Sequence, residues 1–139
     1  MTKRLATIVS LLGVGLAVAP PIAAHHSFGA EYDVQQPITL TGVLTKVEWT
    51  NPHIFIYLDV PDEQTGAVVS WALELGAPNA LMRLGWKRDS LKVNDVVIVD
   101  GTLAKDGGNL ANATTIVLQA TGQRMLAGSS GATPPADRQ

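Results

Sequence analysis

Residues 53–75, HIFIYLDVPDEQTGAVVSWALEL, contain two runs of alternating apolar residues on either side of a polar segment. Every second residue from Ile54 to Val60 is apolar, and the same holds from Val69 to Leu75. A period of two is typical of half-buried β-strands, and the Pro61–Gly66 segment between the runs has the composition of a hairpin connection. The sequence therefore predicts two antiparallel strands, with His53, Phe55 and Tyr57 on the face opposite the apolar residues.

This hairpin suggests a register. If Val60 pairs with Ala67, antiparallel pairing places Ile54 opposite Leu73, and His53 opposite Glu74. Directly opposed Cβ atoms lie about 4.5–5.5 Å apart. We therefore expect a contact between His53 and Glu74. It is either a cross-strand polar pair or a histidine that a carboxylate orients for metal binding.

Three further strands and one short helix are predicted around the hairpin. Residues 38–49 are rich in β-branched residues and change their apolar phase at Gly42, which predicts a bend or bulge there. Helical spacing over Pro78–Leu84 is followed by Gly85, a typical C-terminal stop. The remaining strands are expected at residues 96–103 and 111–119.

The predicted fold class is all-β with one short helix. The order β-β-β-α-β-β, with a bent first strand, is that of an OB-type fold, in which five strands form a small, partly open barrel. An open antiparallel sheet backed by the helix is the alternative. We expect one such domain at residues 38–126, an N-terminal lead at 25–37, and a disordered tail at 127–139 with little apolar surface to order it.

The first 24 residues have the features of a cleavable secretory signal peptide. Lys3 and Arg4 precede the uncharged apolar run Leu5–Ala19, two prolines follow, and Ala24 suits the cleavage position. The run is shorter than the roughly 20 apolar residues that span a bilayer. The sequence therefore predicts export to the periplasm of a bacterium, or secretion, with no stable membrane insertion after cleavage.

Composition excludes several classes of function. The chain has no cysteine, which rules out disulfides and cysteine-based metal sites. Without the signal peptide, 8 basic and 12 acidic residues leave a net charge of −4, which argues against nucleic acid as a partner. No nucleophile elbow, Walker-type loop or His-Glu-x-x-His motif is present, so no catalytic residue is assigned.

Three histidines, His25, His26 and His53, are the candidate metal ligands. Cleavage after Ala24 would make His25 the N-terminal residue, whose α-amine and imidazole can chelate one ion. His26 and His53 would add further imidazoles, with Glu74 orienting His53. Nitrogen ligands of this kind favour Cu(II) among divalent metals. The sequence thus favours a binding or accessory protein that takes up a divalent metal, copper first.

Two alternatives remain open at this point. In the first, the mature N-terminal histidine serves a copper-dependent redox enzyme. In the second, the histidines are purely structural, and an OB-like module binds a small ligand or a protein partner. Phe55 and Tyr57 are then the candidate ligand face, because strands two and three of OB-type barrels commonly carry such surfaces.

Two motifs carry a family resemblance. The stretch Ala24-His25-His26-Ser27-Phe28 spans the predicted cleavage point, and a Trp-x-Asn-Pro-His motif occupies residues 49–53. With these motifs the chain resembles a family of small exported bacterial proteins known as a domain of unknown function, over about residues 24 to 130. The resemblance implies export and a compact β fold, and it carries over no catalytic residue.

Overall fold

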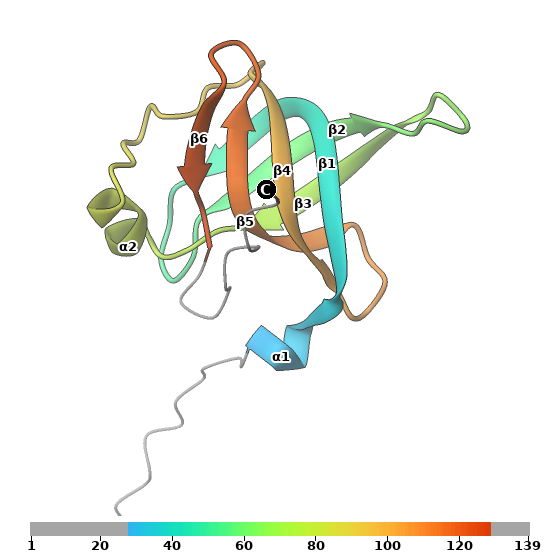
Figure 1. Cartoon of the computed structure of the whole chain (residues 1–139), viewed down its shortest axis with the longest axis horizontal. Helices are drawn as coiled ribbons and strands as arrows, with labels where there is room; N and C mark the ends of the chain where they lie inside the picture. The colour runs from blue at the N-terminus through green and yellow to red at the C-terminus, as the bar shows by residue number, and fades with distance from the viewer. Residues whose placement is uncertain (1–27, 129–139) are drawn as a thin grey trace, which may run out of the picture.

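A computed structural model describes residues 28–128 of the chain. Within this range the protein is mostly β, as the sequence predicts, and its strands share one apolar core. Figure 1 shows how the strands are arranged. The elements are α1 (Phe28–Glu31), β1 (Tyr32–Glu48), β2 (Phe55–Pro61), β3 (Val68–Glu74), α2 (Pro78–Arg83), β4 (Val96–Ala104), β5 (Leu110–Leu118) and β6 (Gln123–Leu126).

The strands form one six-stranded sheet in the order β3-β2-β1-β4-β5-β6, and neighbours in this order are antiparallel. An additional parallel pairing joins β3 to β5, with Ala72 opposite Leu110 and Glu74 opposite Asn112. This pairing brings together two strands that stand at opposite sides of the β3-β2-β1-β4-β5 run. In Figure 1 the β2–β3 hairpin projects from one side of the sheet, and α2 lies at the other side.

β1 is shared between two partners. Its middle, Pro37–Val43, pairs with β4, and its last part, Val43–Glu48, pairs with β2. The first strand therefore pairs with both the second and the fourth. The predicted phase change at Gly42 is wrong: Leu40 and Leu44 are both buried, Val43 is 39% exposed, and the register shifts between Leu44 and Lys46.

Gly42 has a different role from the one expected. A Cβ atom at this position would lie 2.7 Å from the carbonyl oxygen of Asp59 and 2.9 Å from a methyl group of Val60. Glycine is needed there because β2 passes unusually close to β1, while the bulge that reverses the apolar phase lies three residues further on, at Thr45.

The alternation in the hairpin strands is confirmed by burial. Ile54, Ile56 and Leu58 have no exposed surface, and Leu73 and Leu75 are at most 1% exposed. The helix is also confirmed: Pro78 stands in the first turn of α2, and Gly85 ends it with φ of 93°. Leu81 of α2 packs into the same core, so this helix covers part of the apolar face of the sheet.

The structure adds regular structure at both ends of the predicted domain. β1 begins at Tyr32, within the segment expected as a lead, and β6 was not predicted. Ala127 is fully buried, and its N–H donates to the carbonyl oxygen of Thr114 at 2.9 Å. The predicted signal peptide, His25, His26 and the tail from residue 129 onward lie outside the described residues.

Candidate functional site

His53 follows the turn at Asn51 and Pro52 and precedes β2. Its side chain is 40% exposed, and Nδ1 of the ring lies in ion-pair contact with Oε1 of Glu74. The predicted contact between these two side chains is therefore present. One ring nitrogen is occupied by the carboxylate, which leaves Nε2 as the nitrogen with which His53 can act on another group.

The register that produces this contact differs from the predicted one. Phe55, not His53, stands directly opposite Glu74, and Ile56 stands opposite Leu73. The predicted register was wrong by two residues, because the hairpin pairs Pro61 with Val68 and not Val60 with Ala67, so the six-residue connection is displaced by one residue along the chain. A shift of two keeps every side chain on its face, so His53 reaches Glu74 as a diagonal neighbour.

Glu74 is a buried carboxylate with a hydrogen-bonding partner on each oxygen. It ends β3 on the face opposite Leu73, yet it is only 6% exposed. The hydroxyl of Tyr32 donates to Oε2, while Oε1 faces His53. Burying a carboxylate is costly unless its oxygens are satisfied, and these two partners supply that compensation. We call this group the Tyr32–Glu74–His53 cluster.

Tyr32 is the member of the cluster that sequence reasoning missed. It is 2% exposed, and its ring lies 5.3 Å from that of Phe28, between centroids. Burial raises its pKa well above the ordinary value. The hydrogen bond to Glu74 and the negative charges of Glu74, Glu31 and Asp106 act in the same direction. The sequence shows Tyr32 as an aromatic residue in a mostly polar segment, and nothing there names its partner.

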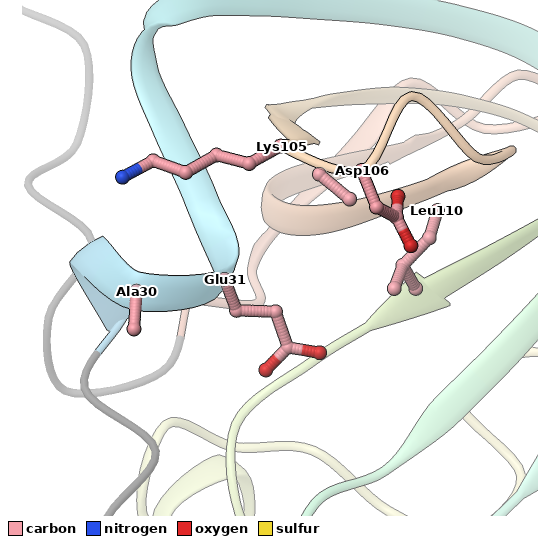
Figure 2. Close-up of a pocket in the computed structure, with 6 residues that line it drawn as sticks. Ala30, Glu31, Lys105, Asp106 and Leu110 are labelled. Atoms are coloured by element: carbon pink, nitrogen blue, oxygen red, sulfur yellow. The ribbon is translucent and has the colours of Figure 1, made fainter.

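A surface pocket of about 550 Å³ adjoins the cluster. It is lined by Ala30, Glu31, Ala104, Lys105, Asp106 and Leu110. Figure 2 shows Glu31 and Asp106 approaching the pocket from α1 and from the β4–β5 connection, while the Lys105 side chain extends away from both. The Lys105 amine instead donates to the carbonyl oxygen of Gly29. The pocket therefore presents two exposed carboxylates next to the buried Tyr32.

The raised pKa of Tyr32 predicts an alkaline limit to stability. In the unfolded chain a tyrosine hydroxyl has a pKa of about 10. Below that pH the contribution of the protonated Tyr32 is fully present, and it is lost as the pH rises above about 10, because the unfolded chain releases the proton first. In Tyr57→Phe protein, where Tyr32 is the sole tyrosine, we expect tyrosinate absorbance to appear only together with unfolding. A reversible titration near pH 10 with the circular dichroism spectrum intact would contradict this.

Phe55 and Tyr57, the expected ligand face, are half-buried on the outer face of β2. The hydroxyl of Tyr57 donates to Oε2 of Glu48 at 2.9 Å, and the Lys46 amine lies 5.1 Å from the centre of its ring. Lys46 also forms an ion pair with Glu48. The hydrogen bond from the Tyr57 hydroxyl to Glu48 is the main reason why the pKa of Tyr57 is raised. The hydroxyl and one ring face of Tyr57 are thus engaged within the protein.

Among residues 28–128, no three histidine, cysteine, aspartate or glutamate side chains are grouped closely enough to hold a metal ion. The Tyr32–Glu74–His53 cluster provides one imidazole and one carboxylate, and His25 and His26 lie before the described range. The described part of the chain therefore offers one oriented nitrogen ligand, and a complete site would need ligands from elsewhere.

Within the same range no helix has the length and apolar character required to cross a membrane. No curated protein matches the chain, and neither does any solved structure. A family model does match, over residues 14–113, which is most of the sequence and includes Tyr32, His53 and Glu74. The chain therefore belongs to DUF6152, a family of unknown function.

Proposed function

We propose that this protein is an exported binding or accessory protein that holds a divalent metal ion, copper first, through His25, His26 and His53. The observation that carries the proposal is the pairing of His53 Nδ1 with the buried carboxylate of Glu74. Metal-binding histidines almost always donate their second ring N–H to a carboxylate, a carbonyl group or water, and this partner fixes the orientation of the ring. His53 has this arrangement and keeps a half-exposed side chain.

The start of the described chain supports the involvement of the N-terminus. Phe28 packs on Tyr32, whose hydroxyl binds the same carboxylate that holds His53. His25 precedes Phe28 by only three residues, and an extended chain spans at most about 3.3–3.6 Å per residue. The chain thus enters the described structure beside the Tyr32–Glu74–His53 cluster, within reach of a ligand set that includes His53.

The chemistry of the donors favours copper. A free N-terminal histidine offers an amine and an imidazole to one ion, and imidazole nitrogens from His26 and His53 complete a nitrogen-rich site. Cu(II) stands at the top of the divalent affinity order for such ligands. Two carboxylates near Tyr32, Glu31 and Asp106, add negative charge that favours a cation in this region.

The barrel architecture and the cellular location of the protein are part of the same proposal. We infer that β1 to β5 form an OB-like, partly open barrel, which is supported by the parallel pairing of β3 with β5 and by α2 between β3 and β4. The composition of residues 1–24 supports export to the periplasm, or secretion, with cleavage after Ala24. Cleavage is essential to the proposal because it creates the amine ligand at His25.

The test is a calorimetric titration with Cu(II) of three forms: the protein beginning at His25, the same protein with one extra N-terminal glycine, and His53→Ala. We expect both altered forms to bind at least about tenfold more weakly, which corresponds to about 1.4 kcal/mol. Affinity of the native form should also fall as the pH drops below about 7.7–8.0, because the amine ligand must lose its proton.

Each outcome has a distinct meaning. Equal affinity of the native and glycine-extended forms would refute the N-terminal chelate. A drop confined to the glycine-extended form would remove His53 from the site. Absence of Cu(II) binding by the native form would overturn the metal proposal and favour the alternative that the His53–Glu74 pair is purely structural.

A further inference from the structure

We propose that the side of the protein formed by α2, the connection from α2 to β4, and β6 is a docking surface for an anionic lipid membrane. This surface consists of residues 82–95 and 124–126, and we call it the α2–β6 surface. The docking is peripheral: side chains enter the headgroup region, and no segment crosses the bilayer. The proposal does not depend on metal binding or on the His53–Glu74 pair.

The charge of the described chain is unevenly distributed. Residues 28–128 have 7 basic and 11 acidic side chains, a formal net charge of 7 − 11 = −4. The α2–β6 surface has a charge of 5 − 2 = +3, which leaves 2 − 9 = −7 on the rest of the described range. Its basic side chains are all exposed, and they are Arg83, Lys87, Arg88, Lys92 and Arg124.

The positive charge of the α2–β6 surface is available to an external partner. Within the described range none of its five basic side chains forms an ion pair with a carboxylate. The two basic side chains elsewhere in that range are engaged, because Lys46 pairs with Glu48 and the Lys105 amine donates to a backbone carbonyl oxygen. Arg88 lies over the ring of Trp49, 5.8 Å from its centre, and this contact leaves its charge uncompensated.

The same surface exposes large apolar side chains between the basic ones. Four of them are close to half exposed, namely Met82 (49%), Leu84 (55%), Val93 (54%) and Leu126 (46%). Arg83 lies between the first two, and Lys92 directly precedes the third. Arg124 lies on the same face of β6 as Leu126, opposite the buried Met125. Each exposed apolar side chain thus has a basic side chain beside it.

Hydrogen bonds hold the parts of the α2–β6 surface together. The indole N–H of Trp86 donates to the carbonyl oxygen of Leu126 at 2.8 Å, which fixes the connection beside β6. Further along the connection, the N–H of Asn94 donates to the carbonyl oxygen of Leu44 at 2.8 Å. In Figure 1, α2, the connection and β6 lie on the same side of the molecule, away from the projecting β2–β3 hairpin.

This combination of side chains favours a bilayer over a soluble acidic partner. Anionic lipids attract clustered lysines and arginines, and apolar side chains next to them enter the boundary between headgroups and acyl chains. A bilayer satisfies both kinds of side chain at any spacing, because its phosphate groups lie directly above its acyl chains. The remaining charge of −7 is repelled by the same lipids, so the α2–β6 surface is turned toward them.

The first measurement is co-sedimentation with vesicles of the protein beginning at His25, since the apolar run Leu5–Ala19 would itself bind lipid. Vesicles of phosphatidylcholine alone are compared with vesicles of phosphatidylcholine and phosphatidylglycerol in equal parts. We expect a partition coefficient at least about tenfold higher for the anionic vesicles, and a decrease as added salt screens the charges. Equal binding to the two kinds of vesicle would overturn the proposal.

Charge reversal locates the binding surface. The double variant Lys87→Glu, Arg88→Glu is expected to bind anionic vesicles at least about tenfold more weakly than the wild type. Its matched control is Lys46→Glu, Lys105→Glu, which changes the total charge equally but outside the α2–β6 surface. We expect this control to retain most of the binding. Equal losses in both would show that total charge, and not this surface, governs binding.

Removal of apolar side chains tests whether they enter the lipid. Leu84→Ser, Val93→Ser is expected to weaken binding, whereas Val34→Ser, Val68→Ser, at two positions that are each 65% exposed elsewhere, is expected to bind as the wild type does. Unchanged binding by the first variant, together with equally tight binding of the wild type to soluble polyglutamate, would assign the surface to an acidic macromolecule and overturn the lipid proposal.

A measurement on the wild type decides the question even where a variant fails to fold. Spin-labelled phosphatidylglycerol in the anionic vesicles should broaden the amide resonances of Leu84 and Val93 and leave those of Val34 and Val68 unchanged. Broadening at Val34 and Val68 in place of Leu84 and Val93 would overturn the assignment of the surface.

Discussion

Replacement of Glu74 by alanine is expected to lower the free energy of unfolding by about 1–3 kcal/mol, the cost of leaving a buried hydrogen-bonding group without its partner. The substitution would leave the buried hydroxyl of Tyr32 without its acceptor and His53 without its carboxylate. It would also open a cavity where Glu74 now packs between Phe55 and Asn112 of the neighbouring strands. Urea unfolding of the metal-free protein, followed by circular dichroism, gives this value.

Glu48→Ala is the matched control for this experiment. Glu48 also accepts a hydrogen bond from a tyrosine and contacts a basic side chain, but its side chain is 35% exposed, against 8% for Glu74. Exposed ion pairs contribute little to stability, so we expect Glu48→Ala to lower the free energy of unfolding much less than Glu74→Ala does. Similar losses for the two variants would show that burial of Glu74 does not govern its contribution.

Replacement of Gly101 by valine is expected to destabilise the protein by at least about 3 kcal/mol, the upper part of the range for overpacked interiors. A Cβ atom at Gly101 would lie 2.5 Å from the carbonyl oxygen of Asn112 and 3.2 Å from its carbonyl carbon. Both atoms belong to the backbone of β5, so no side-chain rotation can relieve the contact. The strands β4 and β5 would have to separate next to the register shift between Asp100 and Gly101.

Substitutions at two other glycines serve as comparisons for Gly101→Val in the same unfolding experiment. Gly42→Val is expected to lose about 1–3 kcal/mol, because its added Cβ would lie 2.7 Å from the nearest backbone oxygen, that of Asp59, which is a slightly looser contact than the 2.5 Å at Gly101. Gly29→Ala should have little effect, since no atom lies within 4 Å of its added Cβ. A stable, normally folded Gly101→Val protein would mean that the close approach of β4 and β5 is not required.

The hairpin shows why the sequence predicts the buried face of each strand correctly but not which residues pair across the two strands. Alternation identified the buried side of β2 and β3 correctly, because only one orientation of the strand buries Ile54, Ile56 and Leu58 together. Any register displaced by two residues preserves that orientation, so alternation alone could not choose between His53 and Phe55 as the partner of Glu74. The connection decides the register, and its hydrogen bonds between Asp62 and Thr65 involve polar residues that fit several turn types.

The beginning of β1 shows a second limit of prediction from the sequence. Residues 33–36 are polar except for Val34, Pro37 follows, and nothing in this segment has the apolar alternation of a strand. Pairing with β4 extends the strand back to Tyr32, which is a tertiary effect. The candidate site was therefore only partly visible in the sequence: His53 and Glu74 were named, whereas the tyrosine that holds Glu74 required the fold. β6 was missed for a similar reason, since Gln123–Leu126 is short and only Met125 is buried.

The sharing of β1 between two partners has a consequence for how the chain folds. Thr39 on β1 binds Asp100 on β4 across 61 positions of sequence, so half of β1 has no partner strand until β4 has formed. Contacts between such distant segments slow folding, because the intervening loop must close before they contribute stability. When the chain is synthesised from its N-terminus, part of β1 has an unpaired edge until β4 forms. Such open strand edges are templates for aggregation. Asp33 and Pro37 lie on that edge, where charge and proline discourage pairing with other chains.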